Sequence, residues 1–329
     1  MRVSGQGVFL DDVVCPRHRR RLSRLGRDVL ACPAGDEYPL VDGIPVLMVD
    51  DDTPTLPAVY EYALGVASGR HPQTQRLSDS GTDPVVQDLI RGTCGNLYKH
   101  LIGGVFEYPI PELRLPPATH DQRFLEVGCH WGRWCVSAAR KGYDVVGIDP
   151  SLEGIQAARR VAAQLEVNAH FVVGDGRRLP FPDETFDVVF SYSVLQHFSR
   201  TDVRATLKEV HRVLRPSGRS LIQLANKWGV RSFYNRARAG FRDASDFDVR
   251  YWTPRELKET FEELIGPSVI EVDGFLSLNA QRTDMGLLRP GARAVVRTSE
   301  ALRAAASVVP WLSTVADSLY VRSIRDEDR

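Results

Sequence analysis

From residue 123 onward, short apolar runs alternate with segments in which apolar residues recur every three or four positions. The short runs predict strands, and the longer period predicts amphipathic helices. Strands are predicted at 124–127, 144–148, 170–173, 186–190 and 220–225, with helices at 133–141, 152–165 and 203–214 between them. Such alternation predicts an α/β fold with a parallel, doubly wound sheet and right-handed crossovers.

The pattern loosens after residue 226. A helix is predicted at 253–264, where Thr253 is a candidate N-cap with Pro254 and Glu256 behind it. Further strands are predicted at 269–281 and 318–324, with helical content near 300–308 between them. We expect the segments 227–252 and 282–317 to form lids over a main domain spanning 121–329.

The first 120 residues predict two additions to that domain. Residues 1–54 contain two Cys-Pro pairs and an apolar strand after a turn, which predicts a small β-rich module. Residues 55–120 predict a linker and a helical cap, because the closely spaced prolines between 108 and 117 disfavour helix there.

Composition narrows the function classes. The 329 residues are 43% hydrophobic and 26% charged, with a formal net charge of +0, which gives no electrostatic reason to expect nucleic acid or an anionic membrane as the main partner. No run of about 18 apolar residues is present, so no membrane span is expected. The first residues show no apolar signal segment and the five cysteines are an odd number, so we expect a cytoplasmic protein without a disulfide framework. The oligomeric state is left open.

Candidate cofactor chemistry lies at the predicted strand ends. The stretch 125–134 includes a tight, small-residue loop between the first strand and the first helix. Asp149 ends the second strand about 20 residues later, a spacing that suits a carboxylate binding ribose hydroxyls. Dinucleotide-binding enzymes share these two features. Gly174-Asp175-Gly176 after the third strand adds a second carboxylate, which suits the exocyclic amine of adenine. The alternatives are an N-cap role for Asp149 and a turn role for Asp175.

These motifs, with Leu179–Val189, Ser191–His197 and Glu209–Gly218, resemble the class I S-adenosylmethionine-dependent methyltransferases, in particular the small-molecule group. The resemblance covers about residues 120–226 and implies a seven-stranded, mostly parallel sheet with an antiparallel last strand. It places the methionine part of the cofactor at the loop, the ribose at Asp149, the adenine at Asp175 and Gly176, and the methyl group near Ser191. The implied loop residues are Glu126, Gly128, Cys129, His130 and Gly132. His130 replaces the family's middle glycine, a position where positive φ is expected and histidine is tolerated.

The N-terminal module is similar to the zinc-ribbon proteins that activate methyltransferases. That family would place two Cys-x-x-Cys knuckles here, whereas this chain offers Cys15, His18 and Cys32. A structural zinc site needs four ligands, so either Asp36 supplies the fourth or the module is metal-free and serves docking or stability.

A hydroxyl acceptor would need a general base, and His197 and His130 are the candidates. The alternative for His197 is packing or capping at a helix start. The expected acceptor is a small molecule or a sugar-containing metabolite, methylated at oxygen, and a loose resemblance at 130–134 and 139–143 points to polysaccharide or secondary-metabolite pathways. The remaining alternatives are a degenerate, non-catalytic binding protein, a nicotinamide-dependent oxidoreductase, and modification of tRNA or protein.

Overall fold

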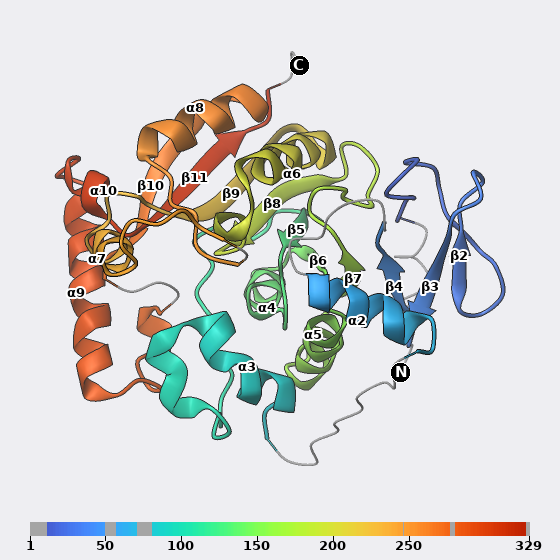
Figure 1. Cartoon of the computed structure of the whole chain (residues 1–329), viewed down its shortest axis with the longest axis horizontal. Coiled ribbons are helices and arrows are strands. Elements are labelled where there is room, and N and C mark those ends of the chain that lie inside the picture. The colour runs from blue at the N-terminus through green and yellow to red at the C-terminus, as the bar shows by residue number, and fades with distance from the viewer. Residues whose placement is uncertain (1–11, 50–56, 71–80, 246, 277–279, 327–329) are drawn as a thin grey trace.

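A single mixed sheet crosses the whole molecule (Figure 1). The computed structural model describes residues 12–49, 57–70, 81–245, 247–276 and 280–326. Within them the sheet runs in the order β1-β2-β3-β4-β7-β6-β5-β8-β9-β11-β10. The strands are β1 Ser23–Arg24, β2 Val29–Ala31, β3 Glu37–Val41, β4 Ile44–Leu47, β5 Arg123–Val127, β6 Asp144–Asp149, β7 His170–Gly174, β8 Phe186–Tyr192, β9 Leu214–Ala225, β10 Ser268–Gly274 and β11 Ser318–Ile324.

The seven strands from β7 to β10 are the sheet that the sequence predicts. Strands β5 to β9 pair in parallel, and β11 is antiparallel to both β9 and β10. The predicted fold class is therefore confirmed. Two strand bounds differ from the prediction by more than two residues. β9 begins at Leu214 rather than 220, because its pairing to β8 resumes beyond an irregularity that lets 215–218 bulge from the ladder. β10 ends at Gly274, past a register shift against β11.

Helices cover both faces of this sheet, as a doubly wound fold requires. The apolar faces of α6 and α8 pack into one hydrophobic cluster, and those of α2, α4 and α5 pack into a second. The helices are α2 Pro57–Ala67, α3 Pro84–Cys94, α4 Arg133–Arg140, α5 Leu152–Gln164, α6 Arg200–Val213, α7 Val230–Arg238, α8 Pro254–Leu264, α9 Pro290–Ala306 and α10 Leu312–Val315, with 3-10 helices η1 Asn96–Leu101, η2 Leu195–His197 and η3 Arg282–Asp284. The predicted capping box of Thr253 is present at α8, whereas α9 begins earlier than predicted, at Pro290.

The N-terminal module extends the main sheet. Strand β4 lies parallel to β7, with Val46 opposite Val173 and Leu47 opposite Gly174. Helix α2 packs its buried residues against the module and the α4–α5 face. Helix α3 and η1 pack on the outer sides of α4 and α5, together with residues 285–296. The described part of the 55–120 segment thus places α2 and α3 against the outside of the main domain. The predicted domain boundaries stay predictions.

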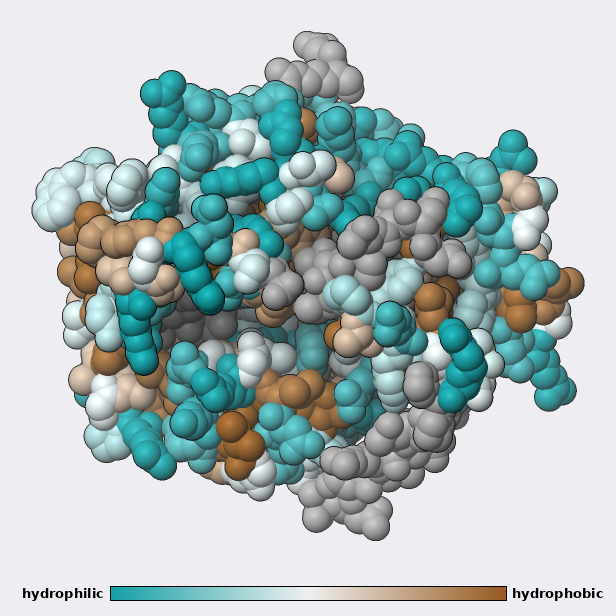
Figure 2. Space-filling view, in the orientation of Figure 1, coloured by the Kyte–Doolittle hydropathy of each residue, from teal (hydrophilic) through white to brown (hydrophobic). Residues whose placement is uncertain are grey.

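The face seen in Figure 2 is mostly hydrophilic, with hydrophobic side chains gathered at the left over α9 and α10 and below over α3. Trp311 and Val308 are among the exposed apolar residues of the first region. No helix within the described part of the chain is long and apolar enough to cross a membrane.

Candidate functional site

A cavity of about 440 Å³ opens at the carboxyl ends of β5, β6, β7 and β8. In open α/β sheets this edge is where ligands bind. The lining comes from the strand ends and the loop after β5, from η2, from helices α2 and α3, and from Phe247 in the 227–252 segment. Of the residues predicted to bind cofactor or act as base, those in the lining are Glu126, Gly128, Cys129, His130, Asp149, Asp175, Gly176 and His197.

The loop after β5 turns tightly because its backbone enters the left-handed region. Gly128 has φ +80°, and a Cβ there would lie 2.3 Å from a methyl carbon of Val194. The N–H groups of Gly128 and Cys129 both donate to the Ile148 carbonyl, at 2.8 and 3.1 Å. His130 has φ +44°, so the position expected to tolerate positive φ adopts it. The loop therefore turns through a positive φ at a histidine where the family pattern has a glycine.

Asp149 is held from both sides by backbone donors. Its Oδ2 accepts from the His130 N–H at 2.9 Å, and its Oδ1 accepts from the Ser151 N–H at 2.8 Å. The N-cap of α5 is Ser151, whose side chain accepts from Gly154. Burial raises the pKa of Asp149, while the nearby His130 and these hydrogen bonds act against the shift. Each carboxylate oxygen still has a lone pair for a further donor such as a ribose hydroxyl.

Asp175 carries an interaction that the sequence did not predict. Its carboxylate accepts from the Arg177 N–H at 2.8 Å and from the Arg177 guanidinium at 2.6 and 3.0 Å. Arg177 also pairs with Asp202 of α6 at 3.1 Å. The turn role considered for Asp175 is therefore present in the structure. Binding of an adenine amine by Asp175 stays a prediction, and it requires the carboxylate to share its lone pairs with Arg177.

Glu126 is a buried acid at the end of β5. Its Oε2 accepts from the Cys135 thiol at 3.0 Å, and burial raises its pKa to about 8. The neighbouring Cys129 thiol is also buried, and it would contact a side chain at Gly147, where an added Cβ would lie 2.8 Å away. The Cys129 side chain thus packs toward β6, which leaves its backbone to face a ligand.

Two predicted cofactor residues do not line the cavity. Gly132, with φ +77°, closes the loop by donating its N–H to the Cys129 carbonyl at 2.8 Å. Ser191 is buried, and its hydroxyl donates to the Val127 carbonyl at 2.8 Å. Its neighbours Tyr192 and Ser193 are the residues of this strand end that reach the cavity. Gly132 and Ser191 therefore lie behind the residues that line the cavity.

The two candidate bases differ in surroundings. The ring of His197 stacks on Phe247 with centroids 3.9 Å apart, and its Nδ1 lies 2.7 Å from the Phe247 carbonyl oxygen. The ring of His130 packs against Gly154 at the start of α5, and its buried Nδ1 has no hydrogen-bond partner. Burial lowers the pKa of both imidazoles. Both are therefore neutral at pH 7, the form that can accept a proton.

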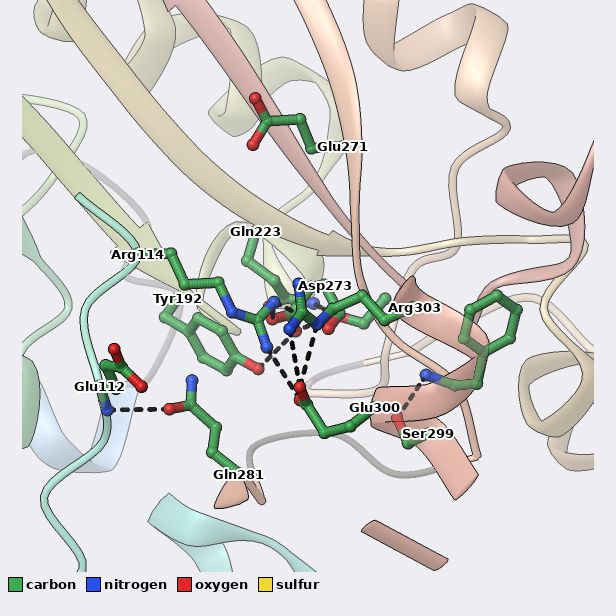
Figure 3. A network of polar contacts seen from close by, with 12 residues as sticks. Glu112, Arg114, Tyr192, Gln223, Glu271, Asp273, Gln281, Ser299, Glu300 and Arg303 are labelled. Carbon is green, nitrogen blue, oxygen red and sulfur yellow. Dashed lines mark hydrogen bonds and ion pairs between the residues drawn. The ribbon is translucent and has the colours of Figure 1, made fainter. Parts of the chain in front are cut away.

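A polar network fixes the cavity wall at Tyr192 (Figure 3). The Tyr192 hydroxyl donates to Asp273 of β10 at 2.6 Å, and Arg114 pairs with the same carboxyl group at 2.9 Å. Arg114 also reaches Glu300 of α9 at 3.2 Å. Burial raises the pKa of Tyr192 well above its ordinary value, with Asp273 adding to the shift. Tyr192 therefore stays protonated and serves as a fixed wall.

Sequence reasoning missed several lining residues. Phe247, Tyr60 and Thr93 come from the lid and the cap. Thr93 accepts from the Trp131 indole N–H at 3.0 Å, which fastens α3 to the cofactor loop. Arg133, the first residue of α4, also lines the cavity and is 4% exposed. The sequence signal that could have identified Arg133 as a lining residue is its position directly after the loop that follows β5.

The N-terminal module gathers the predicted metal ligands. One ligand atom from each of Cys15, His18, Cys32 and Asp36 lies within 4.8 Å of all the others. The Cys15 Sγ is 3.6 Å from the His18 Nδ1 and 3.5 Å from the Asp36 Oδ2, and the Cys32 Sγ is 3.9 Å from the His18 Nδ1. These three separations suit ligands around one tetrahedral ion with bonds of about 2.0–2.3 Å. The His18 Nδ1 and the Asp36 Oδ2 lie only 2.6 Å apart, as an ion pair, and would have to separate around an ion.

The known proteins to which this chain is similar are methyltransferases. Residues 124–218 match the family described as "Methyltransferase domain". Among curated relatives, a ubiquinone biosynthesis O-methyltransferase of Brucella ovis is 30% identical over 156 residues, covering 47% of this chain and 59% of that protein. An ajmaline N-methyltransferase of Rauvolfia serpentina is 37% identical over 123 residues, covering 32% and 42%.

The match therefore spans 59% of the length of the first of these relatives and 42% of the second. A crystal structure of a S-adenosylmethionine-dependent methyltransferase from Methanosarcina mazei is also similar. It is 19% identical, with 64% of this chain and 94% of that chain covered and a TM-score of 0.46. The matched relatives transfer methyl groups to different atoms, so the family alone does not assign an acceptor.

Proposed function

We propose that this chain is a S-adenosylmethionine-dependent methyltransferase that acts on a small molecule or a sugar-containing metabolite, at oxygen. The observation that carries the proposal is the shared cavity. It brings the predicted cofactor residues at the ends of β5, β6 and β7 together with His197 from η2. At about 440 Å³ it falls in the size range of small-ligand sites, which run from about 300 to 1,000 Å³.

The residues present fit the cofactor. Gly128 and Gly176 leave no room for a side chain, since a Cβ would lie 2.3 Å from Val194 in one case and 2.9 Å from Val127 in the other. Internal packing therefore requires glycine at both points, and both residues line the cavity. Asp149 would hold the ribose and Asp175 the adenine. When bound, the cofactor supplies an electrophilic methyl group on a positively charged sulfur.

His197 is the proposed general base. With its Nδ1 proton donated to the Phe247 carbonyl, the neutral ring carries its lone pair on Nε2, which accepts from the Gln196 side-chain amide at 3.4 Å and would exchange that donor for the acceptor hydroxyl. That nitrogen can take the proton of an acceptor hydroxyl as the new bond to carbon forms. Arg250 fixes the backbone around it, donating to the His197 carbonyl at 2.7 Å and to the Gln196 carbonyl at 2.6 Å.

Aromatic walls support an acceptor with an apolar face. Trp131, Trp134, Tyr192, Phe198 and Phe247 all line the cavity. Flat rings of this kind pack against aromatic or sugar rings, while a few polar groups set orientation. A ring-bearing metabolite with a free hydroxyl is the acceptor class we propose, and the loose resemblance noted above places it in polysaccharide or secondary-metabolite pathways.

The first test is calorimetric titration of the purified chain with S-adenosylhomocysteine. Micromolar binding supports the proposal, and no binding overturns it in favour of a degenerate, non-catalytic protein. A panel of phenols and sugars is then screened for formation of S-adenosylhomocysteine. In the presence of an accepted substrate, His197→Gln is expected to lower kcat by about 10²-fold or more. His100→Gln is the matched control, because His100 bonds to the Leu287 carbonyl and does not line the cavity.

We further propose that Cys15, His18, Cys32 and Asp36 hold a structural zinc ion. Two thiolates, an imidazole and a carboxylate are a suitable donor set, and their spacing fits one ion. Elemental analysis of protein purified without chelator is expected to give one zinc per chain. Asp36→Ala is expected to lower that content, and a metal-free wild-type protein would overturn the proposal.

A further inference from the structure

Helix α7 carries its apolar side chains on the side that faces solvent. Val230, Phe233 and Tyr234 recur at the helical spacing of three and four residues and are 56%, 52% and 59% exposed. Of the described residues of α7, Ser232 is the one that is buried, and its N–H donates to the Asp317 Oδ1 at 2.9 Å. The apolar stripe of an ordinary surface helix faces the core. In α7 this arrangement is inverted.

Exposed apolar residues beside α7 extend this surface. The rings of Phe233 and Phe241 pack edge to face with centroids 5.8 Å apart. The chain just before α7 contacts α10, because the Asn226 Nδ2 donates to the Thr314 carbonyl at 2.8 Å (Figure 1). In the turn between α9 and α10, Val308 and Trp311 are among the most exposed apolar residues of the described structure. We call the exposed residues at α7 the α7 patch: Trp228, Val230, Phe233, Tyr234 and Phe241.

Cations accompany these apolar side chains. Residues 227–242 contain five cations and no acid, whereas the whole chain has a formal net charge of +0. These cations are Lys227, Arg231, Arg236, Arg238 and Arg242. Among the described residues only Arg242 of this set forms an ion pair, with Asp248 at 3.5 Å. Residues 285–316 add four arginines against one acid. The balance over the whole chain thus conceals a local excess of positive charge at the α7 patch.

We propose that the α7 patch, together with Val308 and Trp311, docks on the surface of an anionic lipid bilayer. An apolar stripe that contains aromatic residues and is flanked by Lys and Arg is typical of helices that lie in the plane of a membrane interface. The apolar side chains enter the boundary between headgroups and acyl chains, and the cations approach the lipid phosphates. Such docking requires no membrane-spanning helix.

Two other occupants fit the α7 patch less well. A second copy docked with two-fold symmetry would bring like charges together, because such an interface apposes the same surface of both chains. Single-stranded nucleic acid could stack on the aromatic rings, but Val230 and Val308 have no π-face for a base. A bilayer accommodates the aromatic residues, the aliphatic residues and the cations together.

The α7 patch is connected to the cavity through its own segment. The ion pair of Arg242 with Asp248 joins the end of the patch to the neighbour of Phe247. Phe247 lines the cavity and stacks on His197. Docking therefore places lipid next to the segment that carries Phe247.

Co-sedimentation of the full chain with lipid vesicles tests this proposal without cofactor or acceptor. Vesicles with about 30% phosphatidylglycerol are expected to bind the protein at least about tenfold more tightly than pure phosphatidylcholine vesicles, and added salt is expected to weaken that binding. Arg231→Gln/Arg238→Gln is expected to weaken binding to the anionic vesicles about tenfold or more, because each cation near such a surface contributes about fivefold. Phe233→Ser/Tyr234→Ser is expected to weaken it further by removing the buried apolar side chains.

Matched controls change the same kinds of residue elsewhere. Arg20→Gln/Arg24→Gln removes two exposed cations of the N-terminal module, and Ile102→Ser/Phe106→Ser removes two exposed apolar side chains of the cap. Both controls are expected to bind vesicles as wild type does. Circular dichroism shows whether each variant folds, and if one pair does not fold, the other pair and the lipid and salt dependence of wild type decide.

Several results would overturn the inference. They are the absence of vesicle binding, equal binding to neutral and anionic vesicles, and equal loss of binding in the controls and the patch variants. Self-association or oligonucleotide binding that depends on the α7 patch, without vesicle binding, would assign the patch to one of the other occupants instead. Because the assay contains no ligand of the cavity, its failure leaves the proposed function untouched.

Discussion

Glu126 gives the sharpest test of the electrostatics of the cavity. It is fully buried beside the Cys135 thiol, and burial raises its pKa from an ordinary 4.5 to about 8. A carboxyl whose pKa is raised on folding favours the folded state below its unfolded pKa. That contribution is lost as pH rises through the folded pKa. Glu126 is therefore expected to make the protein progressively less stable between about pH 5 and pH 8.

The magnitude follows from the size of the shift. Above pH 5 the unfolded chain ionises Glu126, while the folded chain keeps it protonated up to about pH 8. Each pH unit in that window costs about 1.4 kcal/mol of unfolding free energy, so the full loss approaches about 5 kcal/mol. Of this, about 3 kcal/mol falls between pH 6 and 8, because about two pH units separate these conditions.

Urea unfolding of wild type and Glu126→Gln at pH 6 and pH 9 measures this difference. Glutamine keeps the shape of the neutral acid and cannot ionise, so the variant is expected to gain about 3 kcal/mol on wild type across that interval. Glu153→Gln is the control, because Glu153 also lines the cavity but is exposed, and its curve should follow wild type. Parallel pH dependence of wild type and Glu126→Gln would falsify the claim that Glu126 is neutral in the folded protein at pH 7.

Three further predictions address the loop, the cap and the module. Gly128→Ala is expected to weaken binding of S-adenosylhomocysteine by at least about tenfold, because its Cβ would meet Val194 at 2.3 Å in a positive-φ position. Gly104→Ala, with no atom near the added carbon, should bind normally, and equal affinities would refute the steric argument. Thr93→Val removes the hydroxyl that accepts from the Trp131 indole and is expected to lower the free energy of unfolding by about 1 kcal/mol. An unchanged midpoint in chemical unfolding would contradict this prediction. A zinc chelator is expected to lower the Tm of wild type and to leave unchanged the Tm of a variant that lacks the four N-terminal ligands. Equal Tm shifts in the two proteins would exclude a specific metal effect.

The parts of the fold that the sequence predicts are those with a local signature. The alternation of short apolar runs with helical periodicity predicts β5 to β9 and the helices between them. In a parallel sheet the carboxyl ends of the strands meet at one edge, so Asp149 and Asp175 are predicted to lie there. The positive φ at His130 was predicted because this residue stands where the family has its middle glycine, and histidine is one of the few other residues that tolerate such a backbone.

The remainder depends on contacts between distant segments. Phe247 stacks on His197 across 50 residues, from a stretch with no regular pattern. The ion pair of Asp175 with Arg177 depends on a turn geometry that two residues do not reveal. Arg133 follows the loop in sequence, but a first helical residue can face either way, so only packing shows that it lies inside. The four-residue β4 strand gives no local clue that its partner is β7.

The pairing of β4 with β7 makes the N-terminal module a structural support for the side of the cavity that carries Asp175. Leu47 pairs with Gly174, the residue immediately before Asp175. An open strand edge would otherwise invite pairing with other chains. Deletion of residues 1–49 would expose the edge of β7 and loosen the segment that carries Asp175. A shortened version is therefore expected to aggregate, although every residue matched to the methyltransferase family would still be present.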